Sequence, residues 1–245
     1  DGEFIAKGGA YQKRPSGFGS GAPGTIYLQP AGGVTSSTVI IDNGNMSRFK
    51  DIGHVELSAA TASDVLGSLI VTNNGDVRIS SGETIKVHGN IDTTGGFSTW
   101  TAGALQLVGL DPATIAGSNT FGDFTCTEPG KTIFFGTAAN DNFEIAAGHK
   151  LMLRGVEGTT LDLRPADETL QWKMKVNPDV EVEIFYASVS NSNANAGELV
   201  TAYGSTDLGG NEKWAFSEPI VVGETITWTG AKNADWFESA NWDLE

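Results

Sequence analysis

Hydrophobic residues along this chain fall into short runs, and Gly, Asn and Pro separate one run from the next. The stretch GSNTFGDFTCTEPGKTIFFGTAANDNFEIAAGHKLMLRG, residues 117–155, shows the pattern. Within each run apolar and polar residues alternate and β-branched residues are frequent, as in strands that bury one face. Nowhere do apolar residues sustain the i, i+3, i+4, i+7 spacing of an amphipathic helix. The pattern therefore predicts an almost entirely β chain.

Apolar positions recur in the second half at intervals of about eight to eleven residues, the length of one strand and one turn. A β-sandwich gives similar spacing, but its strands are usually joined by hairpin dipeptides, whereas a parallel β-helix uses Gly and Asn at its bends. We therefore predict an all-β fold, a right-handed parallel β-helix with Gly- and Asn-rich turns. With three strands in each coil, about eight coils fill residues 1–216. The expected inward positions are Phe124, Ile133, Phe143, Leu151, Leu161, Trp172 and Val182.

Residues 1–218 are the predicted solenoid, and its last part differs in composition from the rest. A solenoid needs an atypical last coil, because an open end invites edge pairing with other chains. The acid-rich residues 179–183 and the polar segment SVSNSNANAGELV are suited to such a coil. Trp214 and Phe216, in GGNEKWAF, are then expected to close the end of the core.

A change of composition near residues 218–222 predicts a boundary. Beyond it, the segment ETITWTGAKNADWFESANWD carries Trp228, Trp236 and Trp242 within a short span. We interpret residues 219–245 as a linker followed by the truncated start of a Trp-rich repeat.

Charge and cysteine content narrow the classes of function. The formal net charge is −15, with 15 Lys and Arg against 30 Asp and Glu. Nucleic-acid binding depends on clustered Lys and Arg, so a nucleic-acid partner is not expected. No apolar run is long enough for a membrane helix, and Asp1-Gly2-Glu3-Phe4 is not the start of a signal peptide. The single cysteine, Cys126, lies in an alternating run and is predicted to be a core residue.

Three segments carry a resemblance to a known group of proteins. They are GGAYQKRPSGFGSGAPGTIYLQ, the stretch from TIAGSNTFGDFTCTEPGKTIFF through VSNSNANAG to GGNEKWAF, and TWTGAKNADWFESANWD. Together they resemble β-solenoid segments of very large secreted or cell-surface bacterial proteins, of the autotransporter-passenger and adhesin kind. The resemblance implies an extracellular location and a piece of a longer polypeptide with neighbouring domains.

Most enzymes that have a parallel β-helix fold degrade polysaccharides, so this is the enzymatic activity that we consider. Glycoside hydrolysis needs paired carboxylates, for which Asp141, Glu144, Asp162, Asp167 and Glu168 are available. A lyase needs a base beside a group that neutralises a uronate. The set Lys150, Arg154, Asp162 and Arg164 is the candidate for that role, with His149 nearby. Asp162 and Arg164 are also spaced as an ordinary surface ion pair on one strand face.

Binding of calcium or glycans is the remaining candidate chemistry. No cofactor motif is present, but four acid-bearing turns offer carboxylate and carbonyl oxygens to calcium, at Asp42, Asp76, Asp141 and Asp207. Asx-turns explain the same residues equally well. Sugar rings stack on exposed aromatic side chains, and the candidates are Tyr11, Trp100, Tyr186 and Tyr203, whereas Trp172 and Trp214 occupy expected core positions.

Two hypotheses follow. In the first, the chain is a structural or adhesive segment that acts through length, stiffness and weak glycan contact. In the second, it is a carbohydrate-binding or polysaccharide-cleaving module, a role that the fold alone does not imply. A polysaccharide or cell-surface glycan is the expected partner in both, and insertion into a membrane is expected in neither.

Overall fold

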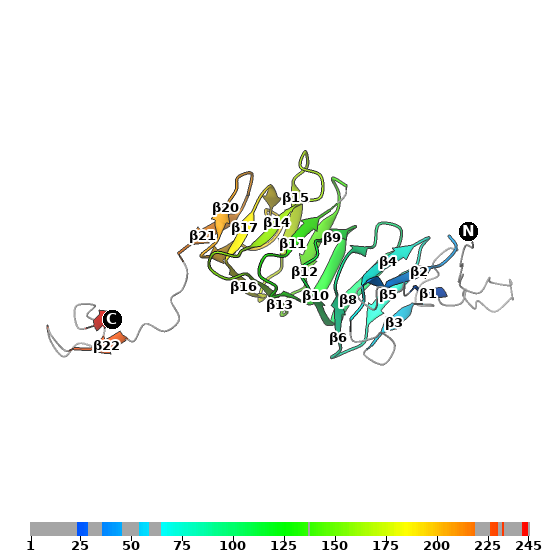
Figure 1. Ribbon diagram of the computed structural model, residues 1–245, viewed down its shortest axis with the longest axis horizontal. Coiled ribbons are helices and arrows are strands. Elements are labelled where there is room, and N and C mark those ends of the chain that lie inside the picture. The colour runs from blue at the N-terminus through cyan, green and yellow to red at the C-terminus, as the bar shows by residue number, and fades with distance from the viewer. Residues whose placement is uncertain are drawn as a thin grey trace.

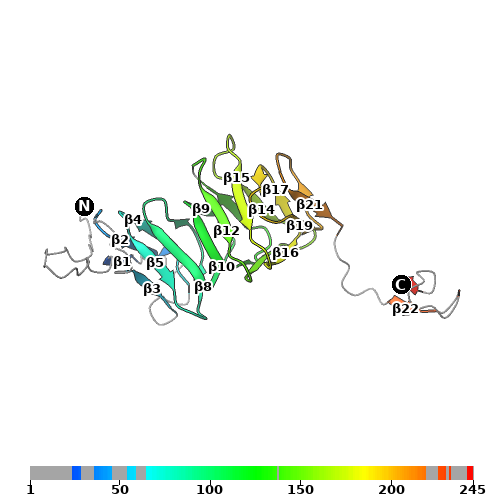
Figure 2. The ribbon, with the colours of Figure 1, turned by 180° about the vertical axis from the view of Figure 1, so that it is seen from behind.

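The structure is a computed structural model that describes residues 24–28, 36–45, 54–58, 65–136, 138–218, 226–229, 232 and 242–244. The secondary-structure elements of this part of the chain are all β-strands (Figure 1). In both views the strands follow one another in chain order along the long axis (Figures 1 and 2). Within the described residues, no helix has the length and apolar character needed to cross a membrane.

One long sheet has nine strands, in the order β1-β2-β4-β7-β9-β11-β14-β17-β20. The first strand pairs antiparallel to its neighbour, and the other eight strands are all parallel. The strands are β1 (Gly24–Leu28), β2 (Thr38–Asp42), β4 (Ser68–Thr72), β7 (Ile91–Asp92), β9 (Ala113–Ala116), β11 (Thr132–Phe135), β14 (Leu161–Pro165), β17 (Ala187–Val189) and β20 (Thr206–Asp207).

A second sheet of twelve strands contains two parallel columns, which the long strands β8 (Phe97–Leu107) and β10 (Asn119–Cys126) join. The first column also holds β3 (Val55–Leu57), β5 (Asp76–Ile79), β12 (Asn142–Ile145), β15 (Trp172–Val176) and β18 (Ser192–Asn193). The second also holds β6 (Thr84–Val87), β13 (Lys150–Arg154), β16 (Glu181–Phe185), β19 (Val200–Tyr203) and β21 (Trp214–Ser217).

The two long strands pass from one column to the other at glycines. A β-carbon on Gly103 would lie 2.6 Å from the carbonyl oxygen of Glu83, and one on Gly122 would lie 2.6 Å from that of Gly103. The register between β8 and β10 shifts at the same place, between Phe121 and Asp123. Only glycine therefore allows the strands to bend here while successive turns of chain stay in contact.

The chain visits the nine-stranded sheet, the first column and the second column in turn, and then returns to the nine-stranded sheet. We call one such circuit a rung. Because parallel strands need long crossovers, residues paired in register lie far apart in sequence, as Ile91 and Ile115 do. The eight parallel strands of the nine-stranded sheet begin eight rungs, between residues 38 and 217. The predicted all-β class with long parallel sheets is confirmed, and the topology is consistent with a β-solenoid.

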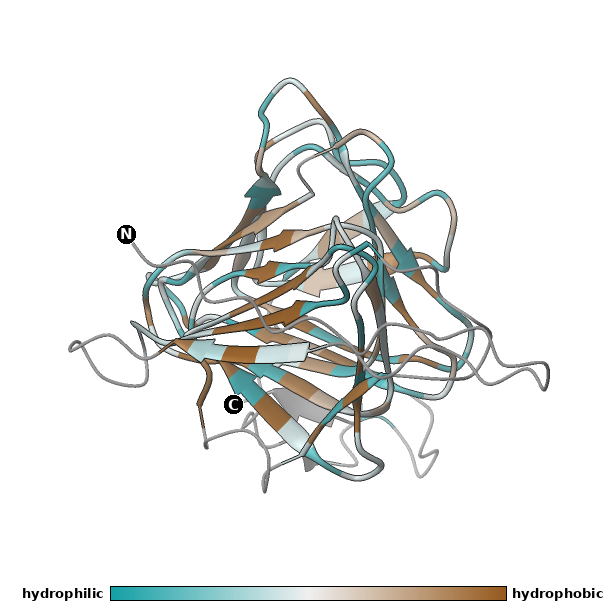
Figure 3. Cartoon of the chain, turned by 90° about the vertical axis from the view of Figure 1, so that its right-hand side faces the viewer, coloured by the Kyte–Doolittle hydropathy of each residue, from teal (hydrophilic) through white to brown (hydrophobic). Residues whose placement is uncertain are grey.

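Apolar side chains from successive rungs stack on one another in the core. Of the seven expected inward positions, six are buried, and Val182 is partly buried against the same core. Cys126 lies in register between Leu107 and Leu153 with no exposed surface, as predicted. Burial raises the pKa of its thiol to about 11. Viewed along the long axis, strands of successive rungs overlie one another, and hydrophobic and hydrophilic positions alternate along them (Figure 3).

Aromatic rings form a continuous column inside the core, from the third rung to the last. Consecutive ring centroids lie 4.0 to 6.3 Å apart, so each ring contacts the next. The column ends at the half-buried side chains of Trp214 and Phe216, in the last rung, where they were expected to close the core. Its members are Trp100, Phe121, Phe143, Phe135, Trp172, Trp214 and Phe216.

Beyond residue 218 the structure describes a small antiparallel pair, β22 (Ile226–Trp228) with β23 (Trp242–Leu244). Trp228 and Trp242 are directly opposite each other in this pair. Trp236 lies outside the described residues, and the assignment of residues 219–245 to a following repeat stays a prediction.

Candidate functional site

The four charged residues considered for a lyase do not form one site. Lys150 and Arg154 lie on β13 of the twelve-stranded sheet, whereas Asp162 and Arg164 lie on β14 of the nine-stranded sheet. Asp162 forms an ion pair with Arg164 on its own strand, as the two-residue spacing suggests. The four residues therefore lie in two separate groups on the surface, one on each sheet.

Each cation on β13 is already paired with a carboxylate of the next rung. The ammonium nitrogen of Lys150 lies 3.1 Å from Glu181 and 2.7 Å from Glu183, and Arg154 also contacts Glu183. The hydrogen bond from Lys150 is the main reason why the pKa of Glu183 lies below its usual value. In turn, Glu183 and Glu181 raise the pKa of Lys150, so it stays protonated rather than acting as a base.

The aromatic residues beside these charges are stacked along the axis of the rungs. Arg154 lies over the ring of Phe185, 5.2 Å from its centroid, and the rings of Phe185 and Tyr203 stack 5.4 Å apart. The faces of Phe185 are therefore covered by its neighbours, and one face of Tyr203 is covered as well. A sugar needs a free ring face, which leaves only the side of Tyr203 toward the last rung, where Ser217 is its partner in register.

A hollow of about 510 Å³ lies at the corner where these rungs return to the nine-stranded sheet. Tyr186 and Phe216 line it together with hydroxyl side chains and two carboxylates. Its other lining residues are Glu157, Gly158, Thr160, Gly204, Ser205, Thr206, Ser217 and Glu218. The lining can offer a polar ligand an aromatic surface, hydroxyl groups and hydrogen-bond acceptors.

Tyr186 holds an unusual backbone conformation at this corner. Its φ is +50°, whereas the same corner of the next rung uses Gly204 with φ +58°. A side chain in this region costs roughly 1–2 kcal/mol relative to an ordinary conformation. The neighbouring rungs hold it there, since its N–H donates to the carbonyl of Tyr203 and its carbonyl accepts from the N–H of Leu161. Of the aromatic residues proposed for glycan binding within the described chain, Tyr186 is the one that lines this hollow.

The prediction for Trp100 needs correction. Its side chain is 1% exposed, and its indole N–H donates to the Asn119 side-chain oxygen at 3.0 Å. That oxygen also accepts hydrogen bonds from Thr93 and Ser98, so the polar residues near Trp100 serve an internal network. Trp100 thus has no ring face for a sugar. Tyr11 lies outside the described residues.

In the turns proposed to bind calcium, the carboxylates accept hydrogen bonds from N–H groups of the protein. Asp42 accepts from the Gly44 amide and the Asn73 side chain, and Asp207 accepts from Gly209 and Asn211. The bonds from the Gly44 and Gly209 amides are those of Asx-turns, and the two asparagine side chains add a further donor to each carboxylate. The described residues contain no group of three or more His, Cys, Asp or Glu side chains placed to hold a metal.

The two other calcium candidates also contact protein donors. Asp141 accepts hydrogen bonds from the amides of Gly117 and Ala138. Asp76 is buried, 3.6 Å from the guanidinium of Arg78. Calcium binding at any of the four stays a prediction.

Glu144, one of the carboxylates considered for hydrolysis, is held by two side chains of the next rung. One of its oxygens accepts hydrogen bonds from Lys175 at 2.8 Å and from Asn177 at 2.7 Å. Burial alone would raise the pKa of Glu144, but these bonds outweigh burial and lower it. A general acid at neutral pH needs the opposite shift, so Glu144 is not suited to that role.

One contact that the sequence reading missed is between His149 and Asp123. The His149 Nδ1 atom lies 3.1 Å from an Asp123 carboxylate oxygen, which also accepts the backbone N–H of Lys150. The two residues are 26 positions apart, on neighbouring rungs. The spacing of one rung is the only signal in the sequence that links them.

No family model matches this chain, and neither a curated protein nor a solved structure matches it.

Proposed function

We propose that this chain is a structural or adhesive β-solenoid segment of a large extracellular bacterial protein. The observation that carries the proposal is the unbroken stack of apolar side chains through the rungs, from Ile41 in the first to Phe216 in the last. A solenoid rung contacts only its neighbours, so its stability and stiffness depend on such continuity. The function would then lie in length, rigidity and the repeated outer surface.

The same proposal includes a closed, right-handed coil. Crossovers between parallel strands are right-handed in nearly all proteins, because twisted strands pack back onto their sheet only in that sense. The eight successive parallel strands of the nine-stranded sheet are each joined by a crossover that runs through both columns of the other sheet. The general rule therefore supports one handedness for the whole stack.

The charged outer surface also suits a scaffold. The ion pairs of Lys150, Arg154 and Lys175 all reach a carboxylate of an adjacent rung, so they join rungs to one another. Surface pairs of this kind each contribute less than about 1 kcal/mol, but they oppose the sliding of one rung over the next. An extracellular location rests on the resemblance of the three sequence segments given above.

A pulling experiment tests the scaffold function. The chain would be held through residues introduced at positions 38 and 217 and extended in an optical trap. A load-bearing segment is expected to keep its length at low force and then to lengthen in steps of one or a few rungs. Smooth extension from the lowest forces would contradict a stiff segment.

The second candidate function, a carbohydrate-binding module, is favoured by one feature, the hollow beside Tyr186. A hollow lined by aromatic, hydroxyl and carboxylate residues is the kind of surface that binds a neutral sugar. The strained backbone of Tyr186 adds to this, because strain of that kind tends to occur at functional positions. Catalysis has less support, since the candidate cations and Glu144 are engaged in ion pairs.

A further inference from the structure

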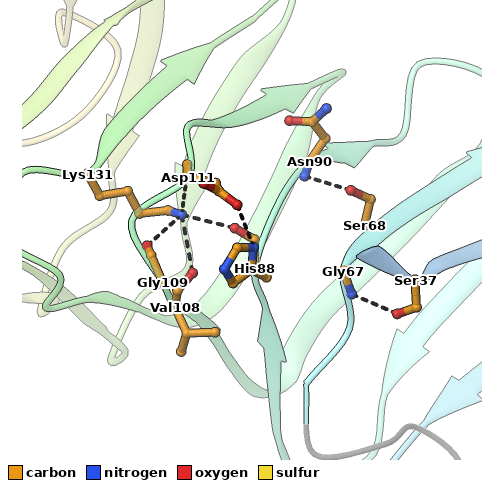
Figure 4. A network of polar contacts seen from close by, with 9 residues as sticks. All are labelled: Ser37, Gly67, Ser68, His88, Asn90, Val108, Gly109, Asp111 and Lys131. Atoms are coloured by element: carbon orange, nitrogen blue, oxygen red, sulfur yellow. Dashed lines mark hydrogen bonds and ion pairs between the residues drawn. The ribbon is translucent and has the colours of Figure 1, made fainter. Parts of the chain in front are cut away.

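Lys131 has no exposed surface, although it is a lysine at a turn between rungs. Its ammonium nitrogen lies 3.0 Å from the carbonyl oxygen of His88, 3.2 Å from that of Val108, 3.0 Å from that of Gly109 and 2.6 Å from that of Asp111. Figure 4 shows the four contacts converging on the one nitrogen. A buried ammonium is expensive unless hydrogen bonds satisfy it, and here they do.

The four carbonyls belong to the two rungs before that of Lys131. His88 follows β6, and Val108, Gly109 and Asp111 follow β8, whereas Lys131 follows β10. The side chain thus connects three successive corners of the same kind. Gly109 makes the arrangement possible: its φ is +71°, and a β-carbon there would lie 2.3 Å from the His88 ring.

The cage is built for positive charge. It presents four acceptors and no donor, and a neutral amine would turn its lone pair against a carbonyl oxygen. Burial lowers the pKa of Lys131, and the negative charges of Asp111 and Glu128 act in the opposite direction. Within the described chain no carboxylate forms an ion pair with Lys131. The protonated form of its side chain is therefore stabilised mainly by the dipoles of the four carbonyl groups.

We propose that this carbonyl cage is a binding site for a small monovalent cation, and that Lys131 supplies the cation as a tethered ammonium. Rings of backbone carbonyls are the ligands by which proteins hold potassium. Calcium, by contrast, takes six to eight oxygens, including carboxylates, at about 2.3–2.6 Å. Because this ammonium is covalently attached to the chain, the Lys131 side chain holds the corners of three rungs together at any ionic composition of the medium.

Removal of the tether should uncover the site. Lys131→Ala deletes the equivalent of one propylammonium ion and opens the cage, whereas Lys131→Met keeps most of the apolar stem without the charge. Thermal unfolding would be followed in sodium, potassium, propylammonium and tetramethylammonium chloride at one ionic strength. Tetramethylammonium is the control cation, because it has no N–H to donate.

The wild-type melting temperature is expected to be the same in all four salts. Lys131→Ala should melt several degrees lower and regain at least half of the loss in potassium or propylammonium, but not in tetramethylammonium. Lys131→Met should be destabilised and should show no recovery. The proposal is overturned if Lys131→Ala responds to the four salts as the wild type does, or if Lys131→Met is as stable as the wild type.

A refolding version covers the case in which Lys131→Ala is obtained only as aggregate. The variant would be diluted from urea into each salt, and the folded fraction would be measured by intrinsic tryptophan fluorescence. Higher recovery in propylammonium than in tetramethylammonium supports the cage. Equal recovery in both salts contradicts it.

Discussion

The rings of Phe135 and Trp172 stack with centroids 4.0 Å apart and planes 12° from parallel. They lie in successive rungs, Phe135 on the nine-stranded sheet and Trp172 in the first column of the other sheet. Trp172 also contacts Trp214 of the last rung, with centroids 6.3 Å apart. This one side chain therefore links the middle of the core to its C-terminal end.

Loss of the Trp172 ring should be strongly destabilising. Truncation of a buried Trp to Ala costs about 3–5 kcal/mol in free energy of unfolding, because it removes contacts and leaves a cavity. Urea unfolding of Trp172→Ala would measure the loss. Lys173→Ala is the matched control on the same strand, since Lys173 is exposed, and its change should stay within about 0.5 kcal/mol. Equal stability of the two variants would contradict a continuous core.

Tyr186, which lines the hollow, can be replaced by glycine with little loss of stability. Tyr186→Gly relieves the positive φ and loses some partly buried surface, so its free energy of unfolding should stay within about 1 kcal/mol of wild type. Tyr203→Gly loses the stack on Phe185 in a strand and should be destabilised by about 2 kcal/mol or more. If Tyr186→Gly proves the less stable variant, then the Tyr186 ring, not the turn, sets stability at this corner.

Acid stability should depend on Glu183. Its pKa is lower in the folded than in the unfolded protein, so the unfolded state takes up protons first as pH falls. The stabilisation by Glu183 is complete above the unfolded pKa of about 4.3 and is lost as pH falls through the folded pKa. Glu183→Gln should therefore flatten the dependence of stability on pH below about 5.

The control for that experiment is Glu157→Gln, at the exposed tip of a corner loop with no ion pair among the described residues. Its acid unfolding curve should match that of the wild type. A Glu183→Gln curve that also matches the wild type would show that the contacts with Lys150 and Arg154 add nothing to stability.

The thiol of Cys126 should be unreactive in the folded protein. Burial between Leu107 and Leu153 raises its pKa to about 11, so at pH 8 well under about 1% is thiolate. Labelling with a disulfide reagent at pH 8 should be slow in buffer and complete within minutes in urea. Fast labelling of the native protein would mean that the core opens at this rung.

Strand positions and core residues were predictable because alternation reports directly on burial. Phe124, Phe143 and Trp172 each lie on the buried side of a strand, where the spacing placed them. The burial of Trp100 was not predictable, because it lies among polar residues such as Ser98 and Thr99. The Ser98 hydroxyl instead points to Asn119, a bond that depends on the next rung and leaves no trace in local sequence.

Contacts between side chains of different rungs could not be predicted from the sequence for a related reason. Lys150 and Glu183 are 33 positions apart, so their contact depends on the register of β13 with β16. The cage around Lys131 is harder still to predict, because all four of its partners are backbone carbonyls. Backbone oxygens are the same in every residue and carry no signal in the sequence.

Affinity electrophoresis through gels cast with neutral or anionic polysaccharides, with and without calcium, tests the central claim most directly. Each polysaccharide would also be assayed for new chain ends, and Tyr186→Gly would be run beside the wild type. The scaffold account predicts weak or no retardation, no new ends and no effect of calcium. Strong retardation that Tyr186→Gly abolishes, or new chain ends in any gel, would contradict it and establish a carbohydrate-active module.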